Sequence, residues 1–389
     1  MKFKKTLSGA LLISALLLQL PIAHADIYSN NNISEKVKAR IEKIVNEPSH
    51  LAGIDSFKRK SKKERIKDNI KWYKIHHETN GHYNRYGLDI KNYRSEKNFM
   101  TSKELKRREI HHKNINPVNH RELMQDKVIF EKVVREHYPE FMPSTYFEFK
   151  GKKVIPTKTA LINSFEDTDS ALKSLPDGKY FIKEVTGSCG NDAILLNKKD
   201  GNLNFRHVTK GDISLNEFWN TTQKTNFMVQ EHVENHEDIK KLSPFALSTI
   251  RIVTTRFHDK VHILSADMRV SCQENAVVDN FHKHGAIVHV NTKTGKLAQY
   301  AHRRLEKSLK VHPISGIKFK NYKLPYWEET LEMVKKLHAI FPEFSSLGWD
   351  AAITPTGPKI IEGNYGWDIA VPQVTTGGIK QKWEKLKNI

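Results

Sequence analysis

The stretch SLGWDAAITPTGPKIIEGN, residues 346–364, predicts a β-hairpin around which the rest of the chain is organised. Apolar and small residues flank Pro-Thr-Gly-Pro at 355–358, a combination typical of a turn. Asp350 then lies on the first strand, and Glu362 and Asn364 lie at the end of the second. Residues two apart point to the same face of a strand, so Glu362 and Asn364 project together, and pairing across the turn is expected to bring Asp350 beside them.

Three oxygen-bearing side chains at one place indicate a cation site. Oxygen ligands without Cys or His suit Mg²⁺, which binds through a few carboxylates together with water and substrate phosphates. A hairpin with acidic ends on a solvated surface shows the same pattern, and the short motif Glu-x-Asn taken alone favours that simpler interpretation. A phosphate-binding stretch upstream reverses the preference.

This upstream stretch joins a predicted strand, KYFIKEV at 179–185, to the loop TGSCGND at 186–192. Gly187 and Gly190 let the backbone approach a ligand and aim N–H groups at phosphate oxygens, and Lys183 on the strand adds a positive charge. A glycine-containing hairpin turn fits the same loop equally well. The loop is not a Walker loop, because GKS or GKT is missing, and it is not G-x-G-x-x-G.

Other predicted strands carry polar residues suited to a nucleotide. The strand NFMVQEHV contains the pair Gln230 and Glu231, and such a strand can present backbone groups to an adenine ring. A further hairpin is predicted at 249–270, with its turn at His-Asp-Lys. Arg251 and Arg269 on its two strands are candidates for phosphate contacts.

Length and charge limit the classes of protein to which the chain can belong. Its 389 residues suffice for two or three domains with hydrophobic cores. Its 64 Lys and Arg against 44 Asp and Glu give a formal net charge of +20, so anionic partners are expected. Its two cysteines exclude a disulfide-rich scaffold and a cysteine-ligated metal site.

The first 25 residues have the layout of a secretory signal peptide. Lysines at the start precede an apolar run at 7–20 and the sequence Ala-His-Ala, which predicts cleavage after Ala25. An uncleaved membrane anchor is the alternative, although the run is short for a bilayer span. We expect a mature chain without a membrane span, exported to a periplasm or outside the cell if the leader is used and cytoplasmic otherwise.

Residues 26–124 predict a basic, mainly helical region, and residues 376–389 a basic tail. Between 55 and 125, nineteen Lys and Arg stand against nine Asp and Glu, so half of the net charge lies there. The run KRKSKKERIK at 58–67, followed by aromatic residues, is suited to nucleic acid, anionic lipid or acidic polysaccharide. A solvated basic helical domain is at least as good an interpretation. Beyond this region Asp126 is a predicted N-cap, and strands then outnumber helices.

The order of these features resembles the ATP-grasp superfamily: a strand lysine with a glycine loop, a Gln-Glu strand, an arginine strand, and Asp followed by Glu-x-Asn. Longer strings narrow the resemblance to its sugar-transfer-associated branch, namely QEHVENHEDIKKLSPFALSTIRIVT (230–254), VVDNFHKHGAIVHVNTKTGKL (277–297), HPISG (312–316) and GWDAAITPTGPKIIEGN (348–364). The resemblance covers roughly 125–373, about two-thirds of the chain, and ordered strings of this length are far more specific than a single motif.

The resemblance implies an α+β ATP-grasp domain at 125–375, in which two α+β subdomains clasp ATP, with ATP and Mg²⁺ as cofactors. It assigns roles to these residues: Lys183 to the α- and β-phosphates, Gly187, Ser188 and Gly190 to the loop over them, Gln230, Glu231 and Val233 to adenine, Asp238 or Glu237 to the ribose, Arg251 to the transferred phosphate, and Asp350, Glu362 and Asn364 to Mg²⁺. The chain departs from the family pattern at Ser248, where Asn is usual, and at His284, which replaces the first of two glycines. The second change concerns the acceptor side, so the acceptor does not follow from the resemblance.

Three functions are compatible with this sequence. Members of the superfamily commonly turn a carboxylate into an acylphosphate that an amine attacks, so the first hypothesis is a Mg-ATP-dependent ligase in cell-surface polysaccharide or glycan modification. The second is a kinase that phosphorylates a hydroxyl acceptor, for example on a sugar. The third is a non-catalytic protein whose basic region holds an anionic polymer. The intact ligand set argues against the third, and the first two separate on whether ADP release needs an amine.

Overall fold

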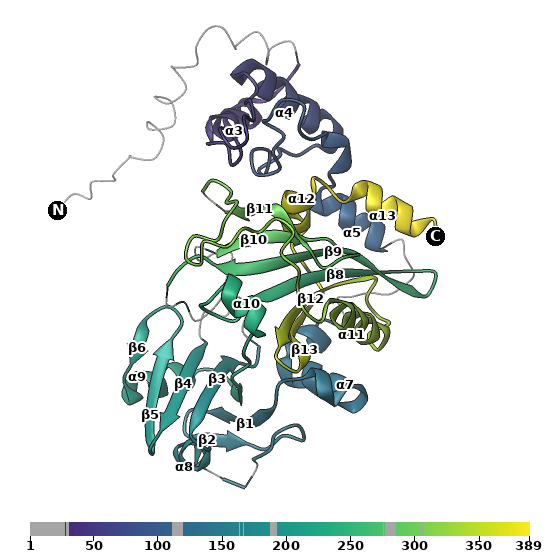
Figure 1. Ribbon diagram of the computed structural model, residues 1–389. Helices are drawn as coiled ribbons and strands as arrows, with labels where there is room; N and C mark the ends of the chain where they lie inside the picture. The colour runs from purple at the N-terminus through teal and green to yellow at the C-terminus, as the bar shows by residue number, and fades with distance from the viewer. Residues whose placement is uncertain are drawn as a thin grey trace, which may run out of the picture. The chain divides into compact units, whose positions relative to one another are not determined.

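The computed structural model describes residues 28, 31–110, 120–162, 164–165, 167–186, 193–274, 276, 285–304 and 306–389. The chain divides into two compact units, one ending at Glu96 and the other running from Lys97 to Ile389 (Figure 1). The predicted leader, the loop residues Gly187, Ser188 and Gly190, and His284 lie outside the described residues. Within the described part of the chain, no helix is long and apolar enough to cross a membrane.

The first unit is helical, as predicted for this region. Its α-helices are α3 (Glu35–Asn46) and α4 (Lys62–His76), and the short η3 (Glu96–Asn98) follows. Helix α4 begins with a capping box, in which Ser61 accepts from the backbone of Glu64 and Glu64 accepts from the backbone of Ser61. The two helices share a small core of Tyr28, Ile33, Ile41, Val45, Ile66 and Ile70.

Two antiparallel sheets form the framework of the second unit (Figure 1). The seven-stranded sheet has the order β2-β1-β7-β3-β4-β5-β6 and consists of β1 (Thr145–Lys150), β2 (Lys153–Ile155), β3 (Gly178–Glu184), β4 (Ile194–Lys199), β5 (Asn202–His207), β6 (Gly211–Ile213) and β7 (Phe227–Glu231). The six-stranded sheet has the order β11-β10-β9-β8-β12-β13 and consists of β8 (Thr249–Phe257), β9 (Lys260–Ser271), β10 (Gly285–Val290), β11 (Leu297–Arg303), β12 (Ser346–Thr354) and β13 (Gly357–Asn364).

Helices surround these sheets, and the predicted α+β class is confirmed. They are α5 (Ser102–Ile110), α6 (Glu122–Gln125), α7 (Lys127–His137), η5 (Pro139–Phe141), α8 (Thr168–Ser174), α9 (Leu215–Thr222), α10 (Glu237–Leu242), α11 (Trp327–Ala339), α12 (Ala370–Thr376) and α13 (Lys380–Lys387). Asp126 is the N-cap of α7, as predicted, because its Oδ1 accepts from the backbone N–H groups of Val128 and Ile129 at 2.9 and 3.1 Å. Helix α13 is packed rather than free, since Trp383 is buried in a core with Trp367.

The predicted hairpin is present as β12 and β13, with Asp350 directly opposite Glu362. The turn is tighter than predicted, because Thr354 already pairs with Gly357. Gly357 has a φ of 124°, a conformation that side-chain-bearing residues rarely adopt. The second strand therefore starts two residues before the predicted 359.

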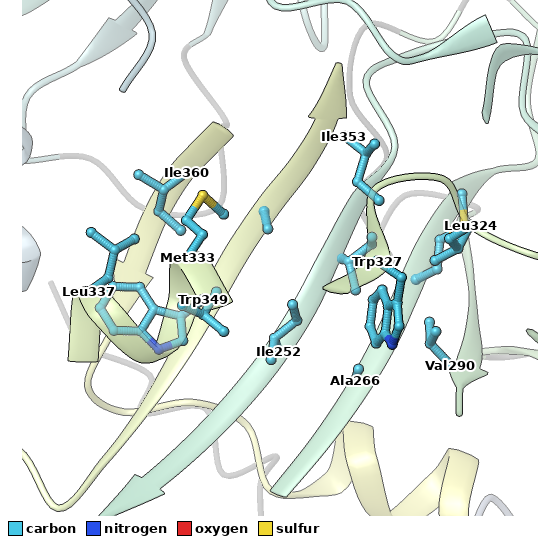
Figure 2. Packing of buried hydrophobic residues seen from close by; sticks show 14 of the residues in the cluster. Ile252, Ala266, Val290, Leu324, Trp327, Met333, Leu337, Trp349, Ile353 and Ile360 are labelled. Carbon is cyan, nitrogen blue, oxygen red and sulfur yellow. The ribbon is translucent and has the colours of Figure 1, made fainter. Parts of the chain in front are cut away.

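The six-stranded sheet has one apolar and one polar face. The apolar face carries alternate residues such as Ile252, Ala266 and Trp349, and α11 covers it with Trp327 and Met333 (Figure 2). Burial of side chains of this size contributes about 1.5–3 kcal/mol each. The intervening residues point to the opposite face, which we call the polar face because Arg251, Arg269 and Asp350 lie on it.

Candidate active site

Asp350 is the centre of a buried charge cluster on the polar face. Arg251 donates from Nε to Asp350 Oδ1 at 2.5 Å and from Nη2 to Oδ2 at 2.9 Å, and Arg269 donates from Nη1 to Oδ2 at 3.1 Å. Burial opposes the ionisation of Asp350, but the two guanidinium groups overcome it and lower its pKa. Asp350 is therefore held as a carboxylate that two arginines share.

Gly348 makes this arrangement possible. A Cβ atom at Gly348 would lie 2.7 Å from Cβ of Trp367 and 3.3 Å from Cδ of Arg251. The first distance is too short for any side chain, so only glycine lets Trp367 and Arg251 pass over this point of β12. Arg251 is thereby laid along the sheet toward Asp350.

Glu362, opposite Asp350, forms no ion pair within 4 Å among the described residues. Burial raises the pKa of its carboxyl and the neighbouring Asp350 raises it further, while Lys127, Arg251 and Lys183 act in the opposite direction. Asn364 follows on the same face of β13, and its Nδ2 is buried without a hydrogen-bond partner among the described residues. Glu362 thus faces Asp350 directly, and Asn364 lies two residues further along the same face.

This donor set fits Mg²⁺ in chemistry. Mg²⁺ prefers oxygen donors, and a cation beside Glu362 would favour its ionised form, which burial and then the charge of Asp350 disfavour. The described residues contain no group of three or more His, Cys, Asp and Glu that could hold a metal by themselves. A magnesium site here would need Asn364, water or phosphate oxygens to complete it, and Asp350 would have to share oxygens that the arginines now occupy.

A cavity lies at the edge of β13, where α6 and α7 and the seven-stranded sheet supply its other walls. It brings two of the predicted nucleotide residues, Lys183 and Gln230, to the same space as Glu362. Close packing of α7 depends on Gly363, because a Cβ there would lie 2.9 Å from the ring of Phe130. The lining residues are Met124, Lys127, Phe130, Glu131, Met142, Lys183, Gln230, Ile361, Glu362 and Gly363.

Lys127 is a cavity residue that the sequence analysis missed. Its backbone N–H donates to the carbonyl of Val185 at 3.1 Å, which ties the start of α7 to the end of β3, and its Nζ donates to the same oxygen at 3.4 Å. Burial lowers the pKa of Lys127 against the pull of Glu362. The available signal was its position directly after the N-cap Asp126, at a helix start that was itself predicted.

Lys183 is destabilised as a cation in the same cavity. Burial and then the charge of Lys127 lower its pKa to about 8, although Glu362 and Glu131 oppose the shift. The charged forms of both Lys183 and Lys127 are disfavoured by burial, so a bound anion would be favourable beside them. Phosphate oxygens would supply that anion.

The three residues predicted to contact adenine differ in burial and in bonding partners. Gln230 is buried, and its Nε2 donates to Glu131 Oε2 at 3.1 Å and to Thr145 Oγ1 at 2.9 Å, so its side-chain donors are used within the protein. Glu231 forms an ion pair with Lys359 at 3.2 Å. Val233 follows the end of β7 and is half-buried.

The candidate for the ribose, Asp238, lies on α10 and does not line the cavity. Its Oδ1 accepts from Lys241 Nζ at 3.0 Å. Its ribose role stays a prediction, as do the roles of Gly187, Ser188 and Gly190, which lie outside the described residues.

Comparison with known proteins identifies one family and several distant structures. The family model described as sugar-transfer associated ATP-grasp matches residues 106–388. No curated protein matches the chain. Among solved structures, an L-amino acid ligase from Bacillus licheniformis is 13% identical over 63% of this chain and 41% of its own, with a TM-score of 0.33.

Two further solved structures are D-amino acid ligases. The VanG D-Ala:D-Ser ligase from Enterococcus faecalis is 14% identical over 68% of this chain and 61% of its own, with a TM-score of 0.37. The D-alanine–D-alanine ligase from Bacillus anthracis is 13% identical over 69% and 63%, with a TM-score of 0.32. The chain spans less than two-thirds of the length of each of these three proteins. Similarity this low gives no information on the substrate.

Proposed function

This chain belongs to the sugar-transfer-associated ATP-grasp family, and we propose that it is a Mg-ATP-dependent ligase that joins a carboxylate to an amine through an acylphosphate. We assign it to the modification of cell-surface polysaccharide or another glycan. The observation that supports the proposal is the mismatch of charge around one cavity. Lysines 127 and 183 have lowered pKa values there, while Glu362 has a raised one.

The proposed reaction has two steps. A carboxylate oxygen of the substrate attacks the γ-phosphorus of ATP, and ADP leaves with the electron pair of the broken P–O bond. The amine nitrogen then attacks the acyl carbon, the C–O bond breaks, and phosphate leaves with that pair while the amine loses a proton. Neither step needs a side-chain nucleophile, so the protein has to position reactants and neutralise charge.

The cationic side chains would share this work. Lys183 of β3 and Lys127 of α7, which both line the cavity, would hold phosphate oxygens, and an anion beside them would raise their lowered pKa values. Arg251 and Arg269 would neutralise the phosphoryl group during transfer. Because they already hold Asp350, they are pre-oriented and lose little freedom when the nucleotide binds.

Asp350, Glu362 and Asn364 would hold Mg²⁺, which would supply positive charge to offset that of the phosphates. Backbone groups at Gln230, Glu231 and Val233 would contact adenine, since the side chain of Gln230 is engaged elsewhere. Gly187, Ser188 and Gly190 would close over the phosphates, and Asp238 would bind the ribose.

Thermal denaturation of the full chain with and without saturating Mg-ATP tests the proposal. A ligand at one hundred times its Kd stabilises the native state by about 2.7 kcal/mol, so the melting temperature should rise. Lys183→Ala and Lys127→Ala should reduce the rise, whereas Lys199→Ala, an exposed lysine on neighbouring β4, should not. A wild-type protein whose melting is indifferent to Mg-ATP would show that the nucleotide assignment is wrong.

The magnesium residues and the reaction type have separate readouts. Glu362→Gln with Asn364→Ala should abolish the part of the stabilisation that depends on magnesium while leaving the unliganded melting temperature close to that of the wild type. ADP release assayed with candidate carboxylates, in the presence and absence of amines, separates a ligase from a kinase. ADP release that needs only a hydroxyl compound would favour the kinase.

A further inference from the structure

The row of charged residues on the polar face continues beyond Arg251. Strand register places Asp267 of β9 opposite Arg251, and His289 of β10 opposite Asp267. Directly opposed residues of an antiparallel sheet share a face, so Glu362, Asp350, Arg251, Asp267 and His289 form one row across five neighbouring strands. Strands lie about 4.8 Å apart, so the backbone at His289 is about 10 Å from that at Arg251.

Asp267 is buried in this row with spare hydrogen-bonding capacity. Its side chain is completely inaccessible, and its Oδ1 accepts from the hydroxyl of Thr375 on α12 at 2.5 Å. Its Oδ2 is buried without a partner among the described residues, and Arg251, although directly opposite, turns to Asp350 instead. A buried carboxyl oxygen without a hydrogen-bond partner costs free energy.

His289 lies against this carboxylate and remains partly open. Its Nδ1 is 3.5 Å from Asp267 Oδ1 and is buried without a hydrogen bond among the described residues, while the side chain as a whole is 25% exposed. A carboxylate beside Nδ1 favours the tautomer that carries its proton there, which leaves Nε2 free to accept a proton. Thr375 on α12 fixes Asp267 from the other side, and Lys382 on α13 is close enough for its charge to interact with that of Asp267.

We propose that His289 is the base that takes the proton of the attacking amine, that Asp267 is a positioning residue for His289, and that the amine acceptor binds beside Nε2 of His289. The proposal rests on the ligase function above. In the second step the amine nitrogen bonds to the acyl carbon, the C–O bond breaks with its electron pair going to phosphate, and the N–H proton goes to Nε2 of His289. Histidine is the side chain that most often accepts a proton in enzyme reactions.

Asp267 could instead have a purely structural role, and the two roles predict different effects of substitution on His289. If Asp267 only anchors α12 through Thr375, the tautomer and reactivity of His289 are irrelevant to it. Thr375→Val removes the anchor and leaves the His289–Asp267 pair, whereas Asp267→Asn keeps a hydrogen-bonding side chain and removes the charge. The two variants therefore separate anchoring from positioning.

The deciding measurement is the imidazole nitrogen NMR spectrum of the full chain labelled with ¹⁵N-histidine at pH 8, with His289→Gln used to assign the signal. We expect the proton on Nδ1 and a bare Nε2 in the wild type and in Thr375→Val, and a shift toward the other tautomer in Asp267→Asn. A wild-type His289 with its proton on Nε2, or one that Asp267→Asn leaves unchanged, would overturn the proposal.

Access to Nε2 is tested with diethyl pyrocarbonate, which modifies unprotonated imidazole, followed by peptide mass mapping. His289 should be modified in the wild type and should lose most of this reactivity in Asp267→Asn, with His262 on β9 as the reference in both proteins. An unmodified His289 beside a modified His262 would show that no acceptor can reach it. A wild-type protein whose melting temperature does not change with Mg-ATP would instead contradict the proposed function without affecting the tautomer measurement. Failure of the proposed function is therefore distinguishable from failure of the His289 proposal.

Discussion

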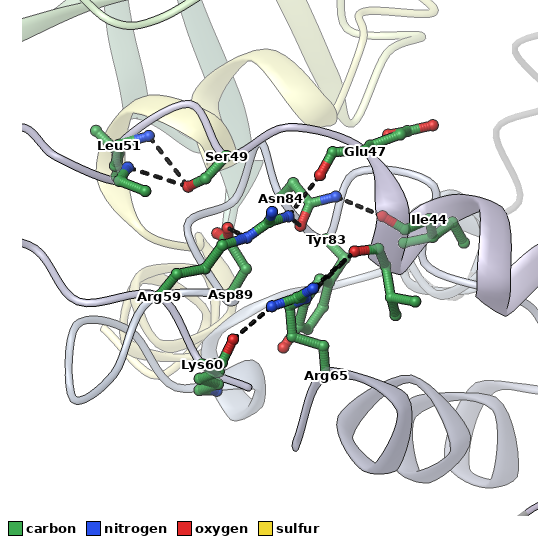
Figure 3. A network of polar contacts seen from close by, with 12 residues as sticks. Ile44, Glu47, Ser49, Leu51, Arg59, Lys60, Arg65, Tyr83, Asn84 and Asp89 are labelled. Carbon is green, nitrogen blue, oxygen red and sulfur yellow. Dashed lines mark hydrogen bonds and ion pairs between the residues drawn. The ribbon is translucent and has the colours of Figure 1, made fainter. Parts of the chain in front are cut away.

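Buried charges serve different purposes in the first unit and on the polar face of the second. In the first unit, Arg65 donates from Nε and Nη2 to the carbonyl of Val45 at 3.3 and 3.0 Å and from Nη1 to the carbonyl of Lys60, and Asn84 donates to the carbonyl of Ile44 at 2.6 Å (Figure 3). On the polar face, Arg251 and Arg269 both donate to the side chain of Asp350. The bonds of Arg65 and Asn84 end on backbone, whereas those of Arg251 and Arg269 end on another side chain. Arg59 of the first unit also pairs with a buried side chain, since its Nε donates to Asp89 Oδ2 at 2.9 Å.

Bonds to backbone stabilise the fold, whereas bonds between charged side chains can be rearranged when a ligand binds. A donor bonded to a backbone carbonyl links chain segments and cannot be released without local unfolding. A carboxylate shared by two arginines, beside Glu362 with its raised pKa and Asp267 with an unpartnered oxygen, can exchange partners when a ligand brings new charges. Asp89 of the first unit also has a raised pKa and one buried oxygen without a partner among the described residues, but Arg59 is its counterion. Incomplete pairing on the polar face therefore indicates function because Glu362 also lines the cavity of Lys127 and Lys183.

Asp350→Asn is the strongest challenge to this comparison. It should destabilise the unliganded protein by about 3–5 kcal/mol, because Arg251 and Arg269 would be left close together without their counterion. Urea denaturation measures the change. Asp212→Asn, which breaks an exposed ion pair with Arg206, should cost less than about 1 kcal/mol and serves as the control. If Asp350→Asn lowers the free energy of unfolding no more than Asp212→Asn does, the Asp350 carboxylate is not needed to balance the charges of Arg251 and Arg269.

Glu148→Gln sharpens the comparison through pH. Burial raises the pKa of Glu148 to about 7 from 4.5, and its Oε1 has no partner among the described residues. The folded state therefore binds the proton more tightly, so stability is greatest below pH 4.5 for this group and falls as pH rises to about 7, by up to about 3 kcal/mol. Urea denaturation at pH 5 and pH 8 should show a smaller loss in Glu148→Gln than in the wild type. Equal losses would contradict the raised pKa.

Arg65→Ala tests the network that ends on backbone. It should destabilise the first unit by about 2 kcal/mol, because buried carbonyls of Val45 and Lys60 lose a charged donor. The Mg-ATP melting shift of the second unit should persist. Lys63→Ala, an exposed residue of the same helix, should have little effect on stability. A loss of the Mg-ATP response in Arg65→Ala would show that this network is not purely structural.

The smallest expected effect on stability concerns the exposed charges of the first unit. Lys63, Lys67 and Lys74 on α4 are exposed, and we predict that they bind an anionic polymer such as an acidic polysaccharide. Replacing all three with Ala should weaken binding to an immobilised anionic polysaccharide, and raising salt should weaken wild-type binding, because exposed charges are screened within about 8–10 Å. Unchanged binding, or an equal loss on replacing the exposed Lys150, Lys199 and Lys210 of the second unit, would remove the prediction.

Local patterns predicted most of the elements correctly. The hairpin of β12 and β13, the N-cap Asp126 and the strand of Lys183 all follow from turn residues, caps and alternation within a few positions. Lys127 did not stand out in the sequence, because the contact of α7 with Val185 joins residues that are 58 positions apart. The buried bond of Gln230 to Glu131, 99 positions away, was likewise not predictable from local patterns.

The family, the hairpin and the common face of Glu362 and Asn364 follow from the amino-acid order, because each depends on neighbouring residues or on ordered strings. The sharing of Asp350 by Arg251 and Arg269, which lie 99 and 81 positions from it, depends instead on how distant strands pair. Strand pairing also places Asp267 and His289 in the same row. The physical reason is strand register: a slip of one residue would turn every side chain of a strand to the other face, and the packing of both faces sets that register.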